Sequence, residues 1–219
     1  MFAIRTSLRT PIRAIVALAL ALGASACAGI PDQTVTRASI VDAPPRAATV
    51  ALDIKEISVT VPKTLQVSEA NSYYPSGDIV WRGDPAGDRH AQVAAIFEEA
   101  MTRGTGQMKN GIPASLDIEV TRFHAQTEKV RYSVGGVHDM TFTITLRNPA
   151  TGEAITPTRR INAHLKGYGG SQAVAADSRG ETAKVRITEH LAGAIRQELT
   201  QPGSYQPDSL GLMAMFASK

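Results

Sequence analysis

Apolar and polar residues alternate along several short stretches of this chain, which is the pattern of β-strands with one buried face. The longest stretch is 140–147, where Met, Phe, Ile and Leu alternate with Thr and Arg, and 116–121 alternates in the same way. The alternation that begins at Val50 changes phase at Lys55–Glu56, which predicts a β-bulge or a bend. Further short stretches with this pattern are 50–54, 57–61 and 161–165, and residues 78–82 (DIVWR) are predicted to form another short strand.

Two other segments have apolar residues three and four positions apart, which predicts amphipathic helices. The first helix runs from Asp88, a suitable N-cap, to about Gly104. The second includes 185–199, and its start is left open because Gly180 interrupts a segment that extends back to Ser171.

The order of these elements is strand, strand, helix, three strands and a final helix. Two amphipathic helices can cover one face of a sheet, so the predicted fold class is α+β. We expect a two-layer sandwich in which two helices cover one face of a mostly antiparallel sheet. The other face carries Thr141, Thr143 and Thr145, and we expect it to meet water or a partner.

The N-terminal segment 1–26 has the organisation of a secretory signal peptide. Three arginines precede an apolar run at 14–22, and small residues follow this run up to Cys27. The run is too short to remain as a membrane span, since a membrane helix needs roughly 20 apolar residues. The chain is therefore predicted to be exported and cut before Cys27.

Residues 24–27 (ASAC) resemble the lipobox of bacterial lipoproteins. The resemblance implies that the Cys27 thiol is linked to diacylglycerol, so that the lipid attaches the mature chain to a membrane. Ala28, rather than Asp, follows the cysteine, and in lipoproteins of this kind that implies sorting to the outer membrane. The alternative is ordinary cleavage at Ala24-x-Ala26, which would leave Cys27 as a free thiol.

Composition divides the rest of the chain into three parts. Residues 27–48 are rich in Ala, Pro, Ser and Thr and have little periodicity, so they predict a flexible tether. Residues 49–202 form the predicted α+β domain. Residues 203–219 form a C-terminal tail with an apolar run at 210–216, and we expect this run to need a groove or a partner.

Charge and cysteine content exclude two other classes of protein. The chain has 23 basic and 20 acidic residues, and three of the basic residues lie in the signal, so the mature part is formally neutral. A nucleic-acid-binding protein would carry a surplus of Lys and Arg, so nucleic acid is not an expected partner. Cys27 is the single cysteine, so the fold depends on a hydrophobic core rather than on disulfides.

Two of the five histidines are predicted to come together in the sheet. If Val120 pairs with Phe142, the same register places His124 opposite His138 on the apolar face, with Cβ atoms about 5 Å apart. Such a pair could bind a metal ion or titrate as a unit, but a zinc site needs three or four ligands. His164 is out of phase with its apolar neighbours and is expected to face solvent. The sequence has no nucleophile or phosphate-loop motif, so it predicts no metal site, no cofactor and no catalytic residue.

Three stretches resemble a bacterial lipoprotein family of uncharacterised function. Together with the lipobox, the element order is similar to that of the auxiliary lipoproteins of lipid-transport and export systems. The resemblance implies a non-enzymatic, lipid-anchored protein of the cell envelope, facing the periplasm at the outer membrane, that acts as a docking or accessory subunit for an envelope protein. The stretches are 78–93 (DIVWRGDPAGDRHAQV), 121–138 (TRFHAQTEKVRYSVGGVH) and 183–191 (AKVRITEHL).

Two alternatives to a docking protein remain open. A carrier of a lipid or another small ligand would have a continuous apolar cavity between the sheet and the helices. A metal-dependent hydrolase would use His124, His138 or Asp139 and would have a deep polar pocket around the histidine pair. A solid core with a polar sheet face would instead favour docking.

Overall fold

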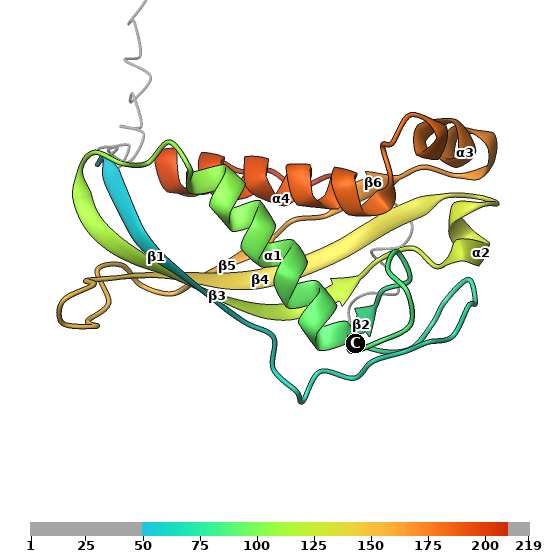
Figure 1. Ribbon diagram of the computed structural model, residues 1–219, viewed down its shortest axis with the longest axis horizontal. Helices are drawn as coiled ribbons and strands as arrows, with labels where there is room; N and C mark the ends of the chain where they lie inside the picture. Colours follow the sequence, from blue (N-terminus) through green and yellow to red (C-terminus); the bar gives the residue numbers. More distant parts are fainter. Residues whose placement is uncertain (1–49, 210–219) are drawn as a thin grey trace, which may run out of the picture. The chain divides into compact units, whose positions relative to one another are not determined.

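The computed structural model describes residues 50–209 as a layer of helices on one face of an open six-stranded sheet (Figure 1). This arrangement confirms the predicted α+β fold class. Within the described residues, no helix has the length and apolar character needed to cross a membrane. The elements in chain order are β1 (Leu52–Thr60), β2 (Ile79–Val80), α1 (Arg89–Thr105), β3 (Ile112–His124), α2 (Glu128–Arg131), β4 (Gly136–Arg147), β5 (Arg159–Asn162), β6 (Leu165–Gly167), α3 (Gly170–Ser178) and α4 (Ala183–Thr200).

The sheet is mixed, with the strand order β1-β3-β4-β5, and the short strands β2 and β6 pair with β3 and β4. β4 is antiparallel to β3, β5 and β6, which agrees with the predicted antiparallel pairing. β1 and β2 are parallel to β3, which the sequence pattern does not indicate. Parallel neighbours need a long crossover connection, and the connection from β1 to β3 contains α1. The predicted irregularity in the first strand is confirmed, because the β1–β3 register shifts between Ile54 and Glu56.

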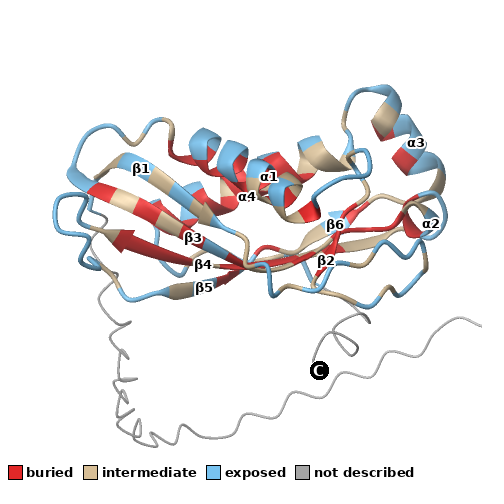
Figure 2. Cartoon of the chain, turned by 60° about the horizontal axis from the view of Figure 1, so that its bottom comes forward, coloured by how far each residue is buried: buried red, intermediate tan, exposed pale blue. Residues whose placement is uncertain are grey.

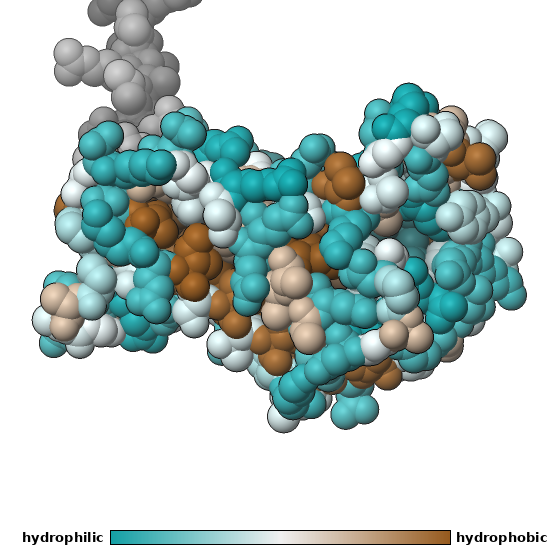
Figure 3. Space-filling model, in the orientation of Figure 1, coloured by the Kyte–Doolittle hydropathy of each residue, from teal (hydrophilic) through white to brown (hydrophobic). Residues whose placement is uncertain are grey.

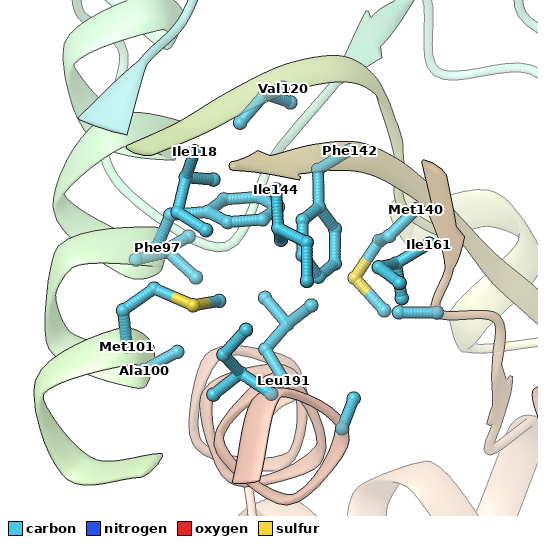
Figure 4. Packing of buried hydrophobic residues seen from close by; sticks show 14 of the residues in the cluster. Phe97, Ala100, Met101, Ile118, Val120, Met140, Phe142, Ile144, Ile161 and Leu191 are labelled. Atoms are coloured by element: carbon cyan, nitrogen blue, oxygen red, sulfur yellow. The ribbon is translucent and has the colours of Figure 1, made fainter. Parts of the chain in front are cut away.

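The core fills the space between the sheet and the helices α1 and α4 (Figure 4). The β3–β4 register pairs Val120 with Phe142 and Ile118 with Ile144, as predicted. Phe142 is fully buried and meets the ring of Phe97 edge-on, with the ring centroids 5.3 Å apart. Figure 2 shows that β4 is buried along most of its length, whereas α3 has a largely exposed surface. β4 is thus the central strand of the domain.

Two residues in the sequence explain where α1 begins and how closely it packs against α4. Asp88 caps α1 as predicted, because its Oδ1 accepts a hydrogen bond from the N–H of Ala91 at 3.1 Å. A Cβ atom at Gly104 would lie 2.3 Å from Cγ2 of Ile195 and 2.7 Å from the carbonyl oxygen of Ala192 in α4. The close approach of α1 and α4 therefore explains why a glycine, which is a poor helix former, lies inside α1.

The C-terminal helical segment consists of two helices. Gly180 lies between α3 and α4 with a φ of +80°, a conformation that a right-handed helix cannot contain. Thr182 then caps α4, because its Oγ1 accepts a hydrogen bond from the N–H of Val185. The separate α3 and the four-residue α2 are not predicted by the periodicity. They surround the N-terminal end of α4 and form a cleft there.

Candidate functional site

His124 and His138 do not form the predicted pair. The β3–β4 register shifts immediately after Val120, so the partner of His124 is Asp139. The extra residue in β3 turns His124 toward the open face of the sheet, while His138 stays on the face that the helices cover. The Nε2 of His124 instead lies 3.0 Å from the carbonyl oxygen of Pro75. The hydrolase hypothesis therefore loses the histidine pair on which it depends.

Asp139 is the centre of a polar cluster on the open face of the sheet. Its Oδ2 accepts a 2.6 Å hydrogen bond from Nε of Arg122, and its Oδ1 lies 3.1 Å from Nδ1 of His164. Burial disfavours the ionised carboxyl, but the hydrogen bonds from His164 and Arg122 outweigh it and hold the pKa of Asp139 below its ordinary value. The expectation that His164 faces solvent is wrong, because this contact leaves its side chain only 12% exposed. Both carboxylate oxygens of Asp139 are engaged in holding strands together.

His138 is fully buried on the helix side of β4. The backbone N–H of Gln126 donates to Nδ1 of His138 at 3.3 Å, which places the ring proton on Nε2. Within residues 50–209, this Nε2 has no hydrogen-bond partner. Burial lowers the pKa of His138 to about 3, and the nearby positive charges of Arg186 and Arg131 act in the same direction. His138 is therefore a neutral buried donor at neutral pH.

A surface cleft of about 410 Å³, which we call the α4 cleft, lies at the N-terminal end of α4. Segments far apart in the chain form it: the residues after β2, the α2 segment, the end of α3 and the first turn of α4. None of the residues that the sequence singles out for chemistry lines this cleft. Its polar and charged wall residues are Arg82, Gln126, Glu128, Arg131, Asp177, Thr182 and Lys184.

Ion pairs position two of the cationic side chains in the α4 cleft. Nη2 of Arg82 lies 3.0 Å from Oε2 of Glu128, and Nζ of Lys184 lies 2.8 Å from Oδ1 of Asp84. Burial opposes ionisation of Asp84, but hydrogen bonds from Lys184 and Trp81 lower its pKa. Asp84 is thus held as a carboxylate beside the cleft, where it fixes Lys184.

An apolar groove of about 360 Å³, which we call the β1 groove, lies at the opposite end of α4, next to the start of β1. Val50, Ile112 and Ile155 expose 53%, 48% and 43% of their surfaces there. Figure 3 shows that more hydrophobic side chains reach the surface along the path of β1. Val50 is also the first residue that the structure describes, and the predicted tether 27–48 ends two residues before it. The remaining walls are Leu52, Leu146, Thr156, Pro157, Arg159, Leu199 and Pro202.

The Thr-rich face of the sheet is less exposed than the alternation predicts. Thr141 and Thr145 are buried, and Oγ1 of Thr145 lies 2.8 Å from Oγ1 of Thr158. Thr143 is intermediate in exposure. Neighbouring side chains on β5 and its preceding loop therefore satisfy part of this face, which leaves less of it for a partner.

The described part of the predicted C-terminal tail, 203–209, contacts the domain. The hydroxyl of Tyr205 lies 2.9 Å from Nε2 of His190, and Oδ2 of Asp208 accepts a hydrogen bond from the N–H of Lys166 at 2.8 Å. The apolar run at 210–216 and the predicted lipidation site Cys27 lie outside the described residues.

Within the described part of the chain, no three His, Cys, Asp or Glu side chains are grouped as a metal ion would require. Two solved structures show weak similarity. One is a "putative lipoprotein" from Caulobacter crescentus CB15, with 13% identity over 66% of this chain and 87% of that chain and a TM-score of 0.36. The other is a Xanthomonas campestris protein of the DUF330 family, with 11% identity over 68% of this chain and 84% of that chain and a TM-score of 0.38. Similarities at this level carry no argument about function.

The sequence places the chain more firmly than these structures do. No curated protein matches it. A family model matches residues 52–215, which include every described strand and helix and extend into the C-terminal tail. This chain therefore belongs to DUF6778, a family of unknown function.

Proposed function

We propose that this protein is a non-enzymatic lipoprotein of the cell envelope that acts as a docking or accessory subunit. Lipid on Cys27 attaches it to the outer membrane, and the domain faces the periplasm. The signal-like segment 1–26 and the lipobox-like residues 24–27 support the anchor. The observation that carries the docking role is the β1 groove, an exposed apolar surface on a domain whose core is otherwise filled.

The position of the β1 groove indicates what occupies it. Residues 28–49 connect Cys27 to Val50 at the edge of the groove, and a flexible chain of this length reaches roughly 25 Å. The groove is thus held near the membrane surface. Arg159 at its wall pairs with Glu198, which gives the apolar centre a polar border. An apolar centre with a polar rim is the anatomy of a protein interface, so the occupant is an apolar segment of an envelope protein close to the membrane.

The filled core favours docking over a small-ligand carrier. Phe97, Phe142 and Leu191 pack directly between the sheet and the helices (Figure 4). A carrier would need a continuous apolar cavity in this layer. Apolar space is present at the surface, in the groove beside β1.

The anchor is tested on the mature protein itself. Intact mass should show an acylated chain that begins at Cys27, and Cys27→Ser should abolish both the acyl mass and partition into detergent. A mature chain without acyl mass would contradict the anchor.

The docking surface is tested by photo-crosslinking from Ile155, with Val174 on α3 as a matched control because it is also apolar and 57% exposed. A photoreactive residue at Ile155, but not at Val174, should give an adduct with one envelope protein. The purified partner should then bind the Ile112→Glu variant at least about tenfold more weakly, as expected when a charge enters an apolar hot spot, and bind Val174→Glu normally. Equal adducts at both positions, or unchanged binding of Ile112→Glu, would disprove the role of the groove.

A further inference from the structure

Two edges of the sheet are protected against pairing with another chain. The outer side of β6 is covered by side chains, because Oδ2 of Asp208 accepts a 2.8 Å hydrogen bond from the N–H of Lys166, and Nη2 of Arg186 donates to the carbonyl oxygen of Lys166, also at 2.8 Å. β5 has only four residues and begins with two charged ones, Arg159 and Arg160. Coverage, charge and short length are the means by which proteins keep strand edges from adding a foreign strand.

β1 is protected over its first half only. The N–H of Ile54 donates to the carbonyl oxygen of Met108 at 2.9 Å, and Asp53 forms an isolated β-bridge with Lys109, so the segment after α1 covers the start of this edge. Among the described residues, 56–60 make no hydrogen bond outside the ladder with β3. This segment (EISVT) contains no lysine or proline, and none of its residues is buried (Figure 2). Residues 56–60, which we call the open edge, are therefore accessible to another strand.

The backbone of the open edge presents hydrogen-bonding groups on the side away from β3. In a strand, residues whose side chains share a face also direct their N–H and C=O groups to the same edge. Ile54, Ile57 and Val59 all pack against the core, and the N–H of Ile54 points away from β3 toward Met108. The N–H and C=O groups of Ile57 and Val59 therefore point away from β3 as well. Two donors and two acceptors thus lie along the open edge without partners in the described residues.

The open edge is complementary to itself when two copies run antiparallel about Ser58. Ile57 of each copy then lies opposite Val59 of the other, so their outward N–H and C=O groups form backbone hydrogen bonds between the copies. Glu56 lies opposite Thr60, and Ser58 lies opposite itself, so no like charges meet. Ile57 and Val59 are half-buried, and each gains contact with a β-branched side chain of the other copy. Because the mature chain is formally neutral, net charge does not oppose this pairing.

We propose that two copies of this protein pair through their open edges and join their sheets into one continuous sheet. A two-fold axis at Ser58, perpendicular to the sheet, relates the copies, which is the commonest symmetry of soluble oligomers. The helices of both copies then lie on the same face of the joined sheet. None of the residues 56–60 lines the β1 groove, so failure of this proposal would leave the proposed docking role unaffected.

Introduced cysteines test the register, because Cys27 is the single cysteine and Cys27→Ser removes it. In the chain that begins at residue 27 and carries Cys27→Ser, the change Ser58→Cys places two thiols directly opposite each other, with Cα atoms about 4.5 Å apart. Oxidation with copper phenanthroline should then give a disulfide-linked dimer, since this distance fits a disulfide. Thr60→Cys is the matched control, because Thr60 is also exposed on this strand but its two copies lie about 14 Å apart. Failure of Ser58→Cys to crosslink, or equal crosslinking of Thr60→Cys, would overturn the proposal.

Sedimentation equilibrium of the same chain without the added cysteines measures the association. We expect a monomer–dimer equilibrium with a Kd below about 100 µM. Ser58→Lys places two like charges opposite each other at the axis and should weaken the association at least about tenfold. Ala175→Lys adds the same charge on the exposed surface of α3 and should associate normally. Circular dichroism checks that both variants fold, and the crosslinking test decides alone if Ser58→Lys does not. A Kd above this limit, or an unchanged Kd for folded Ser58→Lys, would refute the proposal.

Discussion

The β3–β4 ladder has two halves that meet at the register shift after Val120. In the first half, Ile118 pairs with Ile144 and Val120 with Phe142, and all four side chains are buried under the helices. In this half the alternation of the sequence and the alternation of the structure agree. Apolar packing therefore determines which face of the sheet each residue occupies.

In the second half, polar contacts hold the same two strands together. Phe123 turns into the core and meets the ring of Trp81 edge-on, with centroids 5.6 Å apart, while Arg122 pairs with Asp139 on the open face. Because of one extra residue in β3, each later side chain of this strand points to the opposite face of the sheet from the one that strict alternation predicts. The comparison shows that one bulge converts a histidine pair into a buried histidine and a separate carboxylate cluster.

Phe142→Ala should have the largest effect, because it removes the central side chain of the first half. We expect a loss of about 3–5 kcal/mol in the free energy of unfolding, since a buried phenylalanine leaves a cavity. Urea unfolding gives the midpoint. Thr143→Ala, on the same strand and on the other face, should shift this midpoint far less. Equal shifts would show that the two faces of β4 are not different in energy.

Acid should destabilise the domain by protonating His138, which lies at the end of the second half of the β3–β4 ladder. His138 has a folded-state pKa of about 3 against an ordinary value of 6.5. Between these two pH values, His138 is therefore protonated in the unfolded chain and neutral in the folded chain. The contribution of neutral His138 to the free energy of unfolding is fully present above pH 6.5. It decreases by about 1.4 kcal/mol for each pH unit as the pH falls toward 3. Burial also lowers the pKa values of His124 and His190, which adds to this slope.

The variant His138→Asn isolates the contribution of His138 to the acid sensitivity. Asn keeps an acceptor for the N–H of Gln126 but cannot be protonated, so stability measured by urea between pH 7.5 and 5 should fall less steeply than in the unmodified protein. Identical slopes would mean that His138 is not the group that links protonation to unfolding.

Asp139→Asn should lower the free energy of unfolding by less than Phe142→Ala does. This variant and its control compare the ion pairs on the two sides of the bulge. The change leaves Arg122 and His164 without their carboxylate, and we expect a loss of about 1–3 kcal/mol because Asp139 is largely buried. Asp117→Asn is the matched control, since it breaks a pair with Arg147 in the first half that is about 40% exposed. That pair should contribute less than about 1 kcal/mol. Equal losses in thermal unfolding would remove the distinction between the two clusters.

The parts of the fold that the sequence predicts correctly are the segments with a clear hydrophobic periodicity. Apolar and polar residues alternate along 140–147, as in a strand, whereas the apolar residues of 88–104 recur every three or four positions, as in a helix. The secondary structure of both segments and the pairing of Val120 with Phe142 follow from these patterns. The bulge after Val120 follows from no local pattern, because Thr121, Arg122 and Phe123 fit a strand in either phase. The prediction for His124 fails for this reason.

The α4 cleft could not be predicted, because its residues come from four separate segments. Arg82 follows β2, Arg131 ends α2, Asp177 belongs to α3 and Lys184 begins α4. Only tertiary packing brings them together. The Gly180 break and the Thr182 cap are the local signals that mark an exposed helix start, and they are visible in the sequence once the helix is known to be interrupted.

The parallel pairing of β1 with β3 has a consequence for the order in which the chain becomes structured. Leu52 pairs with Ile112, so the first strand needs a partner that is synthesised much later. β1 is synthesised before α1 and before β3. Closing so long a loop costs entropy before any contact repays it. The apolar side chains of β1 therefore remain without their partner strand until β3 has been synthesised.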